Sequence, residues 1–407
     1  MNRRGRLLRA FGPGILLAGT AIGAGDLLTA SLAGSEAGYA VLWAVPFGVA
    51  IKWCLSEGIA RWQMATGKTL LEGWVLHLGR WVQWLFLPYL LLFAFVVGGA
   101  LTNACGVAGS ALLPIGTPEQ SKAIWGVTHS FAALILILRG GFGIFQAAVT
   151  ACVAMMFASA LLTVALVPPD WGAAARGLLP SAGEGGLRWS LALLGGIGGT
   201  MTLLSYGYWI REEGRTGREG LSLCRRDLTA SYIGTGVFGA AVVIIGSRLE
   251  LQGQGIGLAR TMAAQLAERA GPAGEWLFLL AFWGTVFSSM LGVWQSLPWI
   301  FVNFIGLRRG ESGAAVHAAP PRSYRIFLAL LATVPLVLLA APVRTIQFIF
   351  GVFGALFLPL LTLTLLLLNN GTLPPGFRNG WVSNGVLALA LAFFAWMGIE
   401  EILELRD

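Results

Sequence analysis

The sequence predicts an all-α integral membrane protein, and three observations support this fold class. Of 407 residues, 56% are hydrophobic and only 11% are charged, and the mean hydropathy of +0.75 is too high for a soluble protein. Apolar runs of about 18 residues or more recur along the chain, and a helix of that length crosses the hydrocarbon core of a bilayer. Two of these runs, the first and the sixth, are interrupted by clusters of glycine.

The apolar runs predict eleven membrane-spanning helices, which form a single transmembrane domain over residues 1–407. Their approximate ranges are 11–35, 39–62, 82–110, 121–138, 141–167, 188–210, 227–247, 275–306, 325–342, 345–369 and 381–401. Between them we expect a short amphipathic helix over 256–270 and a flexible linker over 310–321.

The positive charges predict the orientation of the chain. With the N-terminus inside, 18 of the 27 Lys and Arg residues fall in cytoplasmic segments, 8 in outer segments and one, Lys52, within a span. Because cytoplasmic loops carry an excess of Lys and Arg, we expect a multi-pass protein of the cytoplasmic (inner) membrane, with its N-terminus inside and its C-terminus outside. The same reasoning interprets the net charge of +8 as a topology signal and not as a nucleic-acid-binding surface.

Short motifs of enzymes are absent from the sequence. It contains no HExxH, no GxSxG and no phosphate-binding loop, and its four cysteines lack the paired spacing of a zinc site. We therefore expect neither an enzyme nor a resident cofactor. The sequence leaves the oligomeric state open.

The first span contains the segment Gly23-Ala24-Gly25-Asp26 in its interior. Glycine costs about 1 kcal/mol of helix stability relative to Ala, and a charged side chain at bilayer depth costs about 2.5–3.5 kcal/mol on insertion scales. A segment that carries both costs predicts a discontinuous helix with Asp26 as a cation ligand at its break. The alternative is a glycine-rich packing face with an Asp that bonds locally.

The sixth span repeats this pattern with Gly195, Gly196, Gly198 and Gly199. Glycine-interrupted spans in corresponding positions of two halves are typical of secondary transporters built from inverted repeats, which bind substrate near the bilayer midplane. We therefore predict two inverted five-helix repeats, at approximately 11–167 and 188–369, followed by an extra helix at 381–401. Packing between helices is the alternative use of such glycines.

Over nearly its whole length the sequence distantly resembles the Nramp (natural resistance-associated macrophage protein) family of divalent-metal transporters. The similarity is most specific over residues 11–74, in the segments GPGILLAG, LAGSEAGYAVLW and LSEGIARWQMATGKTLLEGW. The resemblance implies a leucine-transporter-type fold, here with an eleventh span, and uptake of a divalent metal, usually manganese or iron. In most family members this uptake is symport with protons.

The resemblance also implies candidate metal ligands. The first-helix motif of the family is Asp-Pro-Gly-Asn, and in register this chain has Gly23 at the Asp and Asp26 at the Asn. In the sixth helix, Gly199 stands where the family has the Ala whose carbonyl binds metal, and Thr202 stands at the metal-binding Met. In the tenth span, Gln347 precedes a proline roughly as the Gln of the family does.

The departures from the family pattern bear on the substrate. With Thr202 in place of the thioether, the ligands are all oxygen, which suits Mg²⁺, Mn²⁺ or Ca²⁺. The His of the sixth-helix motif is replaced by Leu204, and the third span contains no Asp or Glu, so proton coupling by the usual route of the family is doubtful. A magnesium-transporting offshoot of the family, which also lacks the methionine and the proton route, is the nearer analogy.

Further polar residues are candidates for the transport pathway. The hydroxyls of Thr29, Thr200 and Ser205 are placed to supply oxygen around the two breaks, or else to bond to carbonyls of their own helices. Gln295 in the eighth span either lines the pathway or bonds to a neighbouring helix. His129 in the fourth span either carries protons or is a neutral, hydrogen-bonded core residue.

Charged residues gather at the inner ends of the second and sixth spans. Glu57 and Arg61 are four residues apart, and Arg211, Glu212 and Glu213 close the sixth span. They form either a charged inner gate or ordinary interfacial ion pairs. Lys52, deeper in the second span, is expected to snorkel or to pair with Glu57.

These observations predict a secondary transporter of divalent metal cations, of the Mn²⁺ or Mg²⁺ class, that works by alternating access. Its partners are the metal ion, as transported substrate, and the lipid bilayer. The alternative is a transporter of the same fold for an amino acid or another small organic solute, because Gly23 and Thr202 leave more room at the breaks than bulkier side chains do.

Overall fold

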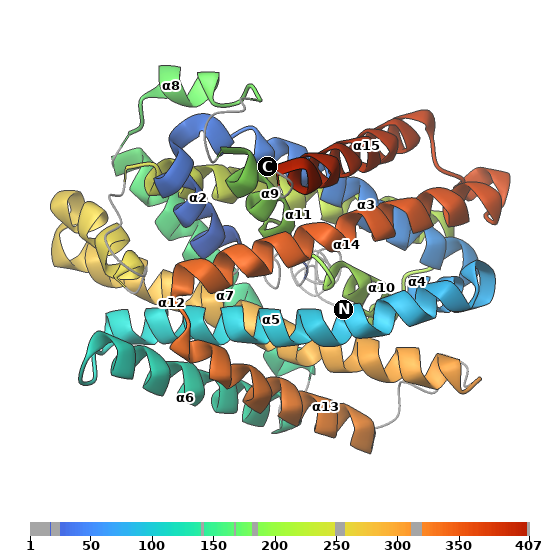
Figure 1. Cartoon of the computed structure of the whole chain (residues 1–407), viewed down its shortest axis with the longest axis horizontal. Helices are drawn as coiled ribbons and strands as arrows, with labels where there is room; N and C mark the ends of the chain where they lie inside the picture. The colour runs from blue at the N-terminus through green and yellow to red at the C-terminus, as the bar shows by residue number, and fades with distance from the viewer. Residues whose placement is uncertain are drawn as a thin grey trace, which may run out of the picture.

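Every regular element in the described part of the chain is a helix (Figure 1). The computed structural model describes residues 17, 25–139, 142–166, 168–180, 186–248, 257–310 and 320–404. The prediction of an all-helical protein is therefore confirmed over these ranges.

The first half of the chain supplies nine helical elements. They are the π-helical turn η1 (Gly25–Thr29), α2 (Ala30–Ala37), the 3-10 turn η2 (Gly38–Val41), α3 (Ala44–Thr66), α4 (Leu70–Gly73), the π-helical turn η3 (Trp74–Leu78), α5 (Arg80–Leu112), α6 (Pro118–Arg139) and α7 (Phe142–Leu166).

The second half begins with the short helix α8. Its elements are α8 (Trp171–Arg176), α9 (Gly186–Gly196), α10 (Leu203–Glu212), α11 (Gly217–Gly246), α12 (Leu258–Arg308), α13 (Arg322–Thr333), the 3-10 helix η5 (Val334–Ala340), α14 (Val343–Gly371), the 3-10 turn η6 (Pro375–Phe377) and α15 (Trp381–Glu404).

The predicted spans from the second to the eleventh all coincide with helices, and of the first span the residues from Gly25 onward are described. Among the described residues, six helices are long and apolar enough to cross a membrane, and the bent pair Leu27–Val41 and Ala44–Thr66 would make a seventh. The chain bends by 107° between the two helices of this pair. The sixth span does not pass the same test because it is divided into two short helices, α9 and α10.

Two boundaries differ from the prediction. Helix α11 begins ten residues before the predicted start of its span, at Gly217, and its first turns carry exposed polar side chains such as Arg218 and Glu219. Asp227, at the predicted start, is inaccessible to solvent and pairs with Arg215 at 3.0 Å. The predicted amphipathic helix at 256–270 is the first part of α12, which kinks at Gly271. Most of the predicted linker, residues 311–319, lies outside the described residues.

The helices pack as two groups with α14 between them (Figure 1). We call α2, α3, α9, α10 and α11 the bundle, and α5, α6, α12 and α13 the scaffold; within each group the helices contact one another. Helix α14 contacts α3 and α9 of the bundle and α5 of the scaffold. The centre of the molecule is therefore where η1, α9 and α14 meet.

The ninth span changes from α13 to the 3-10 helix η5 near Pro335, which lacks an N–H and cannot continue the α-helical hydrogen bonds. Side chains of the scaffold bond to carbonyls of this segment: Ser130 Oγ donates to the Ala332 carbonyl at 2.7 Å, and Asn103 Nδ2 donates to the Leu338 carbonyl at 2.9 Å. Irregular backbone at membrane depth requires such partners.

Candidate functional site

The sixth span is broken in its middle, as predicted. Helix α9 ends at Gly196, α10 begins at Leu203, and the residues between them are not helical. Gly198 and Gly199 have φ angles of +70° and +77°, in the left-handed region that costs about 1–2 kcal/mol for a residue with a Cβ atom. These two glycines therefore make the break, and the local sequence is sufficient to place it.

The neighbouring glycine has a different role, which is packing. A Cβ atom on Gly195 would lie 1.8 Å from the carbonyl oxygen of Gly351 on α14, and one on Gly354 would lie 2.7 Å from Thr200 Cγ2. Both readings of the glycine cluster thus hold, at different residues. The close approach brings α14 against the break.

A lysine lies at the end of α9. Lys52 reaches from α3, is inaccessible to solvent, and donates through Nζ to the carbonyls of Gly195, at 3.1 Å, and Ile197. Hydrogen bonds that involve a charged group contribute about 1.5–3 kcal/mol each, and a buried ammonium needs them. The sequence analysis expected Lys52 to snorkel or to pair with Glu57. Total burial excludes snorkelling, and the two carbonyl contacts were not anticipated.

The other side of the break is held by a tyrosine. Tyr232 of α11 donates to the Gly198 carbonyl at 3.4 Å, and its hydroxyl lies 2.9 Å from Ser56 Oγ of α3. A tyrosine hydroxyl and a lysine on two different helices thus bond to three carbonyls, one in the last turn of α9 and two in the unwound segment after it. Lys52 had a signal in the sequence, because an ionisable residue inside a span marks a functional site. Tyr232 was not predicted.

The predicted break of the first span is only partly covered by the structure. Gly23 lies outside the described residues, and Asp26 is described in its backbone alone, as the second residue of η1. Element η1 packs against α9, α11 and α14, and its Leu27 and Leu28 are buried. The backbone of Asp26 is therefore in a turn that packs against α9, the first half of the broken span, and its role as a ligand stays a prediction.

Three predicted site residues carry buried oxygens that have no hydrogen-bond partner within the described part of the chain. They are Thr29 Oγ1 on η1, Ser205 Oγ on α10 and Gln347 Oε1 on α14. For Thr29 and Ser205, this disagrees with the alternative of bonding to a carbonyl of the same helix. A buried polar group without a partner costs about 1–3 kcal/mol, so these oxygens are candidates for binding water or an ion.

The amide nitrogen of Gln347 has a partner, and two further predicted residues, Thr200 and Thr202, lie in the break itself. Gln347 donates through Nε2 to the Ala100 carbonyl of α5 at 2.9 Å, which joins α14 to the scaffold and orients the amide. Thr200 and Thr202 are buried within the break, beside Gly199. Thr29, Ser205 and Gln347 lie on η1, α10 and α14; η1 and α14 contact α9, and α10 follows the break.

The charged residues at the ends of α3 and α10 have different partners among the described side chains. Glu57 is buried and accepts from Arg61, with distances of 2.5 and 3.1 Å, and pairs with Arg225 of α11 at 2.8 Å. Arg211 contacts Glu72. Within the part of the chain whose side chains are described, the gate suggested from the sequence is therefore represented by two networks.

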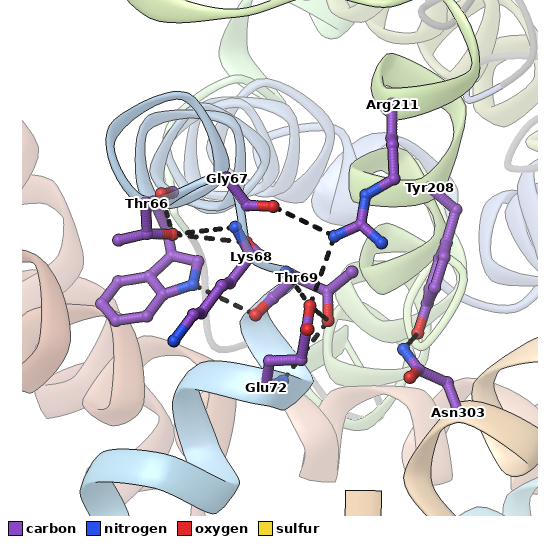
Figure 2. A network of polar contacts seen from close by, with 9 residues as sticks. Thr66, Gly67, Lys68, Thr69, Glu72, Tyr208, Arg211 and Asn303 are labelled. Atoms are coloured by element: carbon purple, nitrogen blue, oxygen red, sulfur yellow. Dashed lines mark hydrogen bonds and ion pairs between the residues drawn. The ribbon is translucent and has the colours of Figure 1, made fainter. Parts of the chain in front are cut away.

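The second network joins α10 to the connection after α3 (Figure 2). Arg211 Nη2 donates to the Gly67 carbonyl at 3.2 Å and lies 3.3 Å from Glu72 Oε2. Glu72 is placed by a capping box, in which Thr69 N donates to its carboxylate at 2.6 Å. From the same face of α10, Tyr208 accepts from Asn303 of α12 (Figure 2).

His129 has the partners of a neutral imidazole. Trp283 Nε1 can only donate, and it lies 2.7 Å from His129 Nε2, so that nitrogen accepts. The proton is then on Nδ1, which donates to the Trp125 carbonyl at 2.7 Å. This geometry favours the core reading over proton transport. Gln295 is half-buried on α12, and its backbone carbonyl accepts from Tyr324 at 3.3 Å.

The candidate cation ligands are hydroxyl, amide and carbonyl oxygens. Among the residues whose side chains are described, no three His, Cys, Asp or Glu side chains gather as a metal cluster. Oxygen ligands of this kind suit hard cations that keep part of their hydration shell.

Comparisons with known proteins agree on the fold. The profile "Nramp: Natural resistance-associated macrophage protein-like" matches residues 14–404. A comparison with curated protein sequences finds no match.

Among solved structures, a manganese transporter from Eremococcus coleocola in complex with an aromatic bis-isothiourea substituted compound has 18% identity and a TM-score of 0.74, covering 98% of this chain and 88% of that one. MhsT in complex with L-phenylalanine has 14% identity and a TM-score of 0.59, covering 97% of each chain. The nucleobase-cation-symport-1 family transporter Mhp1 has 13% identity and a TM-score of 0.57, covering 92% and 82%. These similarities show a leucine-transporter-type fold.

Proposed function

Because the chain belongs to the natural resistance-associated macrophage protein family, a family of transporters and not of enzymes, we propose that it carries divalent metal cations of the Mn²⁺ or Mg²⁺ class across the cytoplasmic membrane. In this proposal it is a secondary transporter that works by alternating access. The two inverted repeats extend approximately over 11–167 and 188–369, and the N-terminus is inside.

One observation carries the proposal: the sixth span contains an unwound segment, and the elements η1, α10 and α14 carry buried oxygens that lack partners in the described residues. In transporters built from inverted repeats, unwound carbonyls and half-helix ends coordinate ions near the midplane. Asp26, the carbonyls of Gly23 and Gly199, Thr202 and Gln347 are the proposed ligands. A single carboxylate balances half of the charge of a dication, so we expect the ion to retain water, as Mg²⁺ prefers.

The packing suggests how the site opens to each side. The break and α2 belong to the bundle. Helix α14 connects the bundle to the scaffold, because it packs against α9 and because its Gln347 bonds to Ala100 of α5. Rocking of the bundle against the scaffold would expose the ion to one side of the membrane at a time. The Arg211–Glu72 network lies at the end of the bundle that is predicted to be cytoplasmic and would close that side.

Uptake of Mg²⁺ and Mn²⁺ into proteoliposomes, measured in parallel with the internal pH monitored, tests the substrate and its coupling. We expect saturable uptake of at least one ion, without the acidification that proton symport would produce. Acidification that follows the metal gradient would contradict the absence of proton coupling, and no uptake of either ion would contradict the function itself.

Replacing Asp26 tests the site. We expect Asp26→Ala and Asp26→Asn to abolish uptake because each removes the only charged ligand, while expression and thermal stability are kept. Asp170→Ala, which removes an exposed carboxylate on the loop before α8, is the matched control and should transport normally. Full uptake by the Asp26 variants would remove this residue from the site.

The alternative substrate, an amino acid or another small organic solute, is favoured by one observation. An ammonium, that of Lys52, already bonds to carbonyls of the break, and a second positive charge there is repelled. Thermal-shift measurements of the purified protein against metals and organic solutes distinguish the two substrates, because a true ligand stabilises the native state by mass action.

A further inference from the structure

Lys52 is the most unusual side chain of the bundle. It lies in the middle of α3, has no solvent-accessible surface, and extends to the C-terminal end of α9 (Gly195 and Ile197). The C-terminal end of a helix carries a partial negative charge, and its last carbonyls have no partner within the helix. A positive charge is therefore stabilised at this place.

The break is also shaped around the stem of the lysine. A Cβ atom on Gly198 would lie 3.3 Å from Lys52 Cδ and 3.1 Å from Tyr232 Cε1, so the two side chains close over the glycine. Tyr232 in turn bonds to the Gly198 carbonyl and to Ser56, four residues after Lys52 on the same face of α3. The lysine, the tyrosine and the serine form one packed unit around the unwound carbonyls.

Carbonyl oxygens at an unwound helix are ligands for monovalent cations as well as for an ammonium. We propose that the carbonyls of Gly195 and Ile197 form a monovalent-cation site that this chain fills with its own Lys52 ammonium. The tethered ammonium holds the sixth-span break in its unwound form, so that the native state needs no dissolved monovalent ion. This inference depends on the geometry of the break and not on the transported substrate.

Removal of the lysine side chain should expose the site. In purified full-length Lys52→Ala, we expect a lowered thermal midpoint in N-methylglucamine chloride, because that cation is too large to enter. Methylammonium, Na⁺ or K⁺ at the same ionic strength should raise the midpoint saturably and recover at least half of the loss. The unmodified protein should show no difference among these cations.

Two variants separate this effect from general destabilisation. Lys122→Ala removes another buried lysine, whose Nζ donates to one carbonyl, that of Ala341, at a distance of 3.2 Å. This contact is not at the break, so the variant should show no cation-specific recovery. Lys52→Met fills the space of the lysine stem without a charge, and should be destabilised but not recovered. Equal responses of Lys52→Ala and Lys122→Ala to the cations would overturn the proposal.

If Lys52→Ala does not fold, Lys52→Ser is measured in the same way, with extraction and purification in methylammonium. Failure of both variants to fold in every cation, methylammonium included, also counts against the proposal, because an external ammonium should replace the missing one. The readout is stability without divalent metal, so a negative result leaves the proposed transport of metal ions standing.

Discussion

Lys52 and Glu57, five residues apart on α3, show how single buried charges are satisfied in this protein. Lys52 bonds to helix-end carbonyls, whereas Glu57 binds two arginines, Arg61 of its own helix and Arg225 of α11. A buried charge without partners costs several kcal/mol, so each of these residues constrains the position of a second element. Lys52 ties α3 to α9, and Glu57 ties α3 to α11.

At the same scale, the break depends on the backbone of Gly199. Gly199→Ala places a Cβ atom at a φ of +77°, which costs about 1–2 kcal/mol, and should reduce uptake because the carbonyl at the proposed ion site turns. The thermal midpoint measures the loss of stability, and uptake per folded molecule measures the effect on the ion site.

Gly214→Ala is the matched control for Gly199→Ala. It has a φ of +67° with nothing within 4 Å of an added Cβ, so it carries the same backbone cost in the turn after α10, away from the break. We expect a similar loss of stability with normal uptake. Equal uptake by the two variants would show that the backbone of Gly199 does not shape the site.

At the scale of elements, α10 is held by polar side-chain contacts with two other parts of the chain. Arg211 attaches it to Gly67 and Glu72 in the α3–α4 connection, and Tyr208 attaches it to Asn303 of α12 (Figure 2). The side chains of Arg211 and Glu72 are 21% and 11% exposed, so this pair is partly shielded from water. Such contacts can open without unfolding a helix, which is what a gate requires.

Replacing Arg211 should loosen this end of the bundle. A partly exposed ion pair contributes about 0.2–1 kcal/mol, and the loss of 1 kcal/mol raises the open population about fivefold. In Arg211→Ala we therefore expect amide hydrogen exchange over residues 67–73 to be faster by up to that factor.

The matched control for Arg211 is Arg344→Ala. Arg344 pairs with Glu36 at 2.6 Å, and its side chain is 50% exposed, so its loss should leave exchange at residues 67–73 unchanged. Unchanged exchange in Arg211→Ala as well would mean that the contact does not restrain α10.

At the scale of the whole molecule, α14 lies between the bundle and the scaffold, whereas α15 belongs to neither (Figure 1). Helix α15 contacts α14 and α3, and its Phe393 packs edge-on against Trp43 and Phe47. In a membrane, lipid tails are as apolar as these rings and can replace the contact at little cost. The eleventh span is therefore an accessory helix in this architecture.

A chain that ends at Gly380 tests this view. We expect it to insert and to retain at least half of the uptake, because every described candidate site residue lies on other elements. The amide contact of Asn370 with Asn384, at 2.9 Å, is also lost, and Asn384→Ala measures that loss alone. A folded but inactive truncated protein would show that α15 takes part in transport.

Much of the fold followed from the sequence because helix formation in a bilayer depends on local properties. Runs of apolar residues predicted the spans, and Gly198 with Gly199 predicted the sixth-span break, since a left-handed backbone needs glycine whatever surrounds it. The start of α11 was misjudged for the opposite reason. Its first turns are polar and largely exposed, and the Arg215–Asp227 pair joins them to the turn before the helix; hydropathy does not register either feature.

The sequence by itself predicted the long apolar helices, the place where the sixth span unwinds and which residues are polar inside it. Only the tertiary structure decided the partners of those residues: Lys52 with the end of α9, Arg211 with Glu72, His129 with Trp283 and Gln347 with Ala100. The physical reason is range. A backbone conformation is set by residues a few positions apart, whereas a hydrogen bond between helices depends on distances that only the packed bundle and scaffold define.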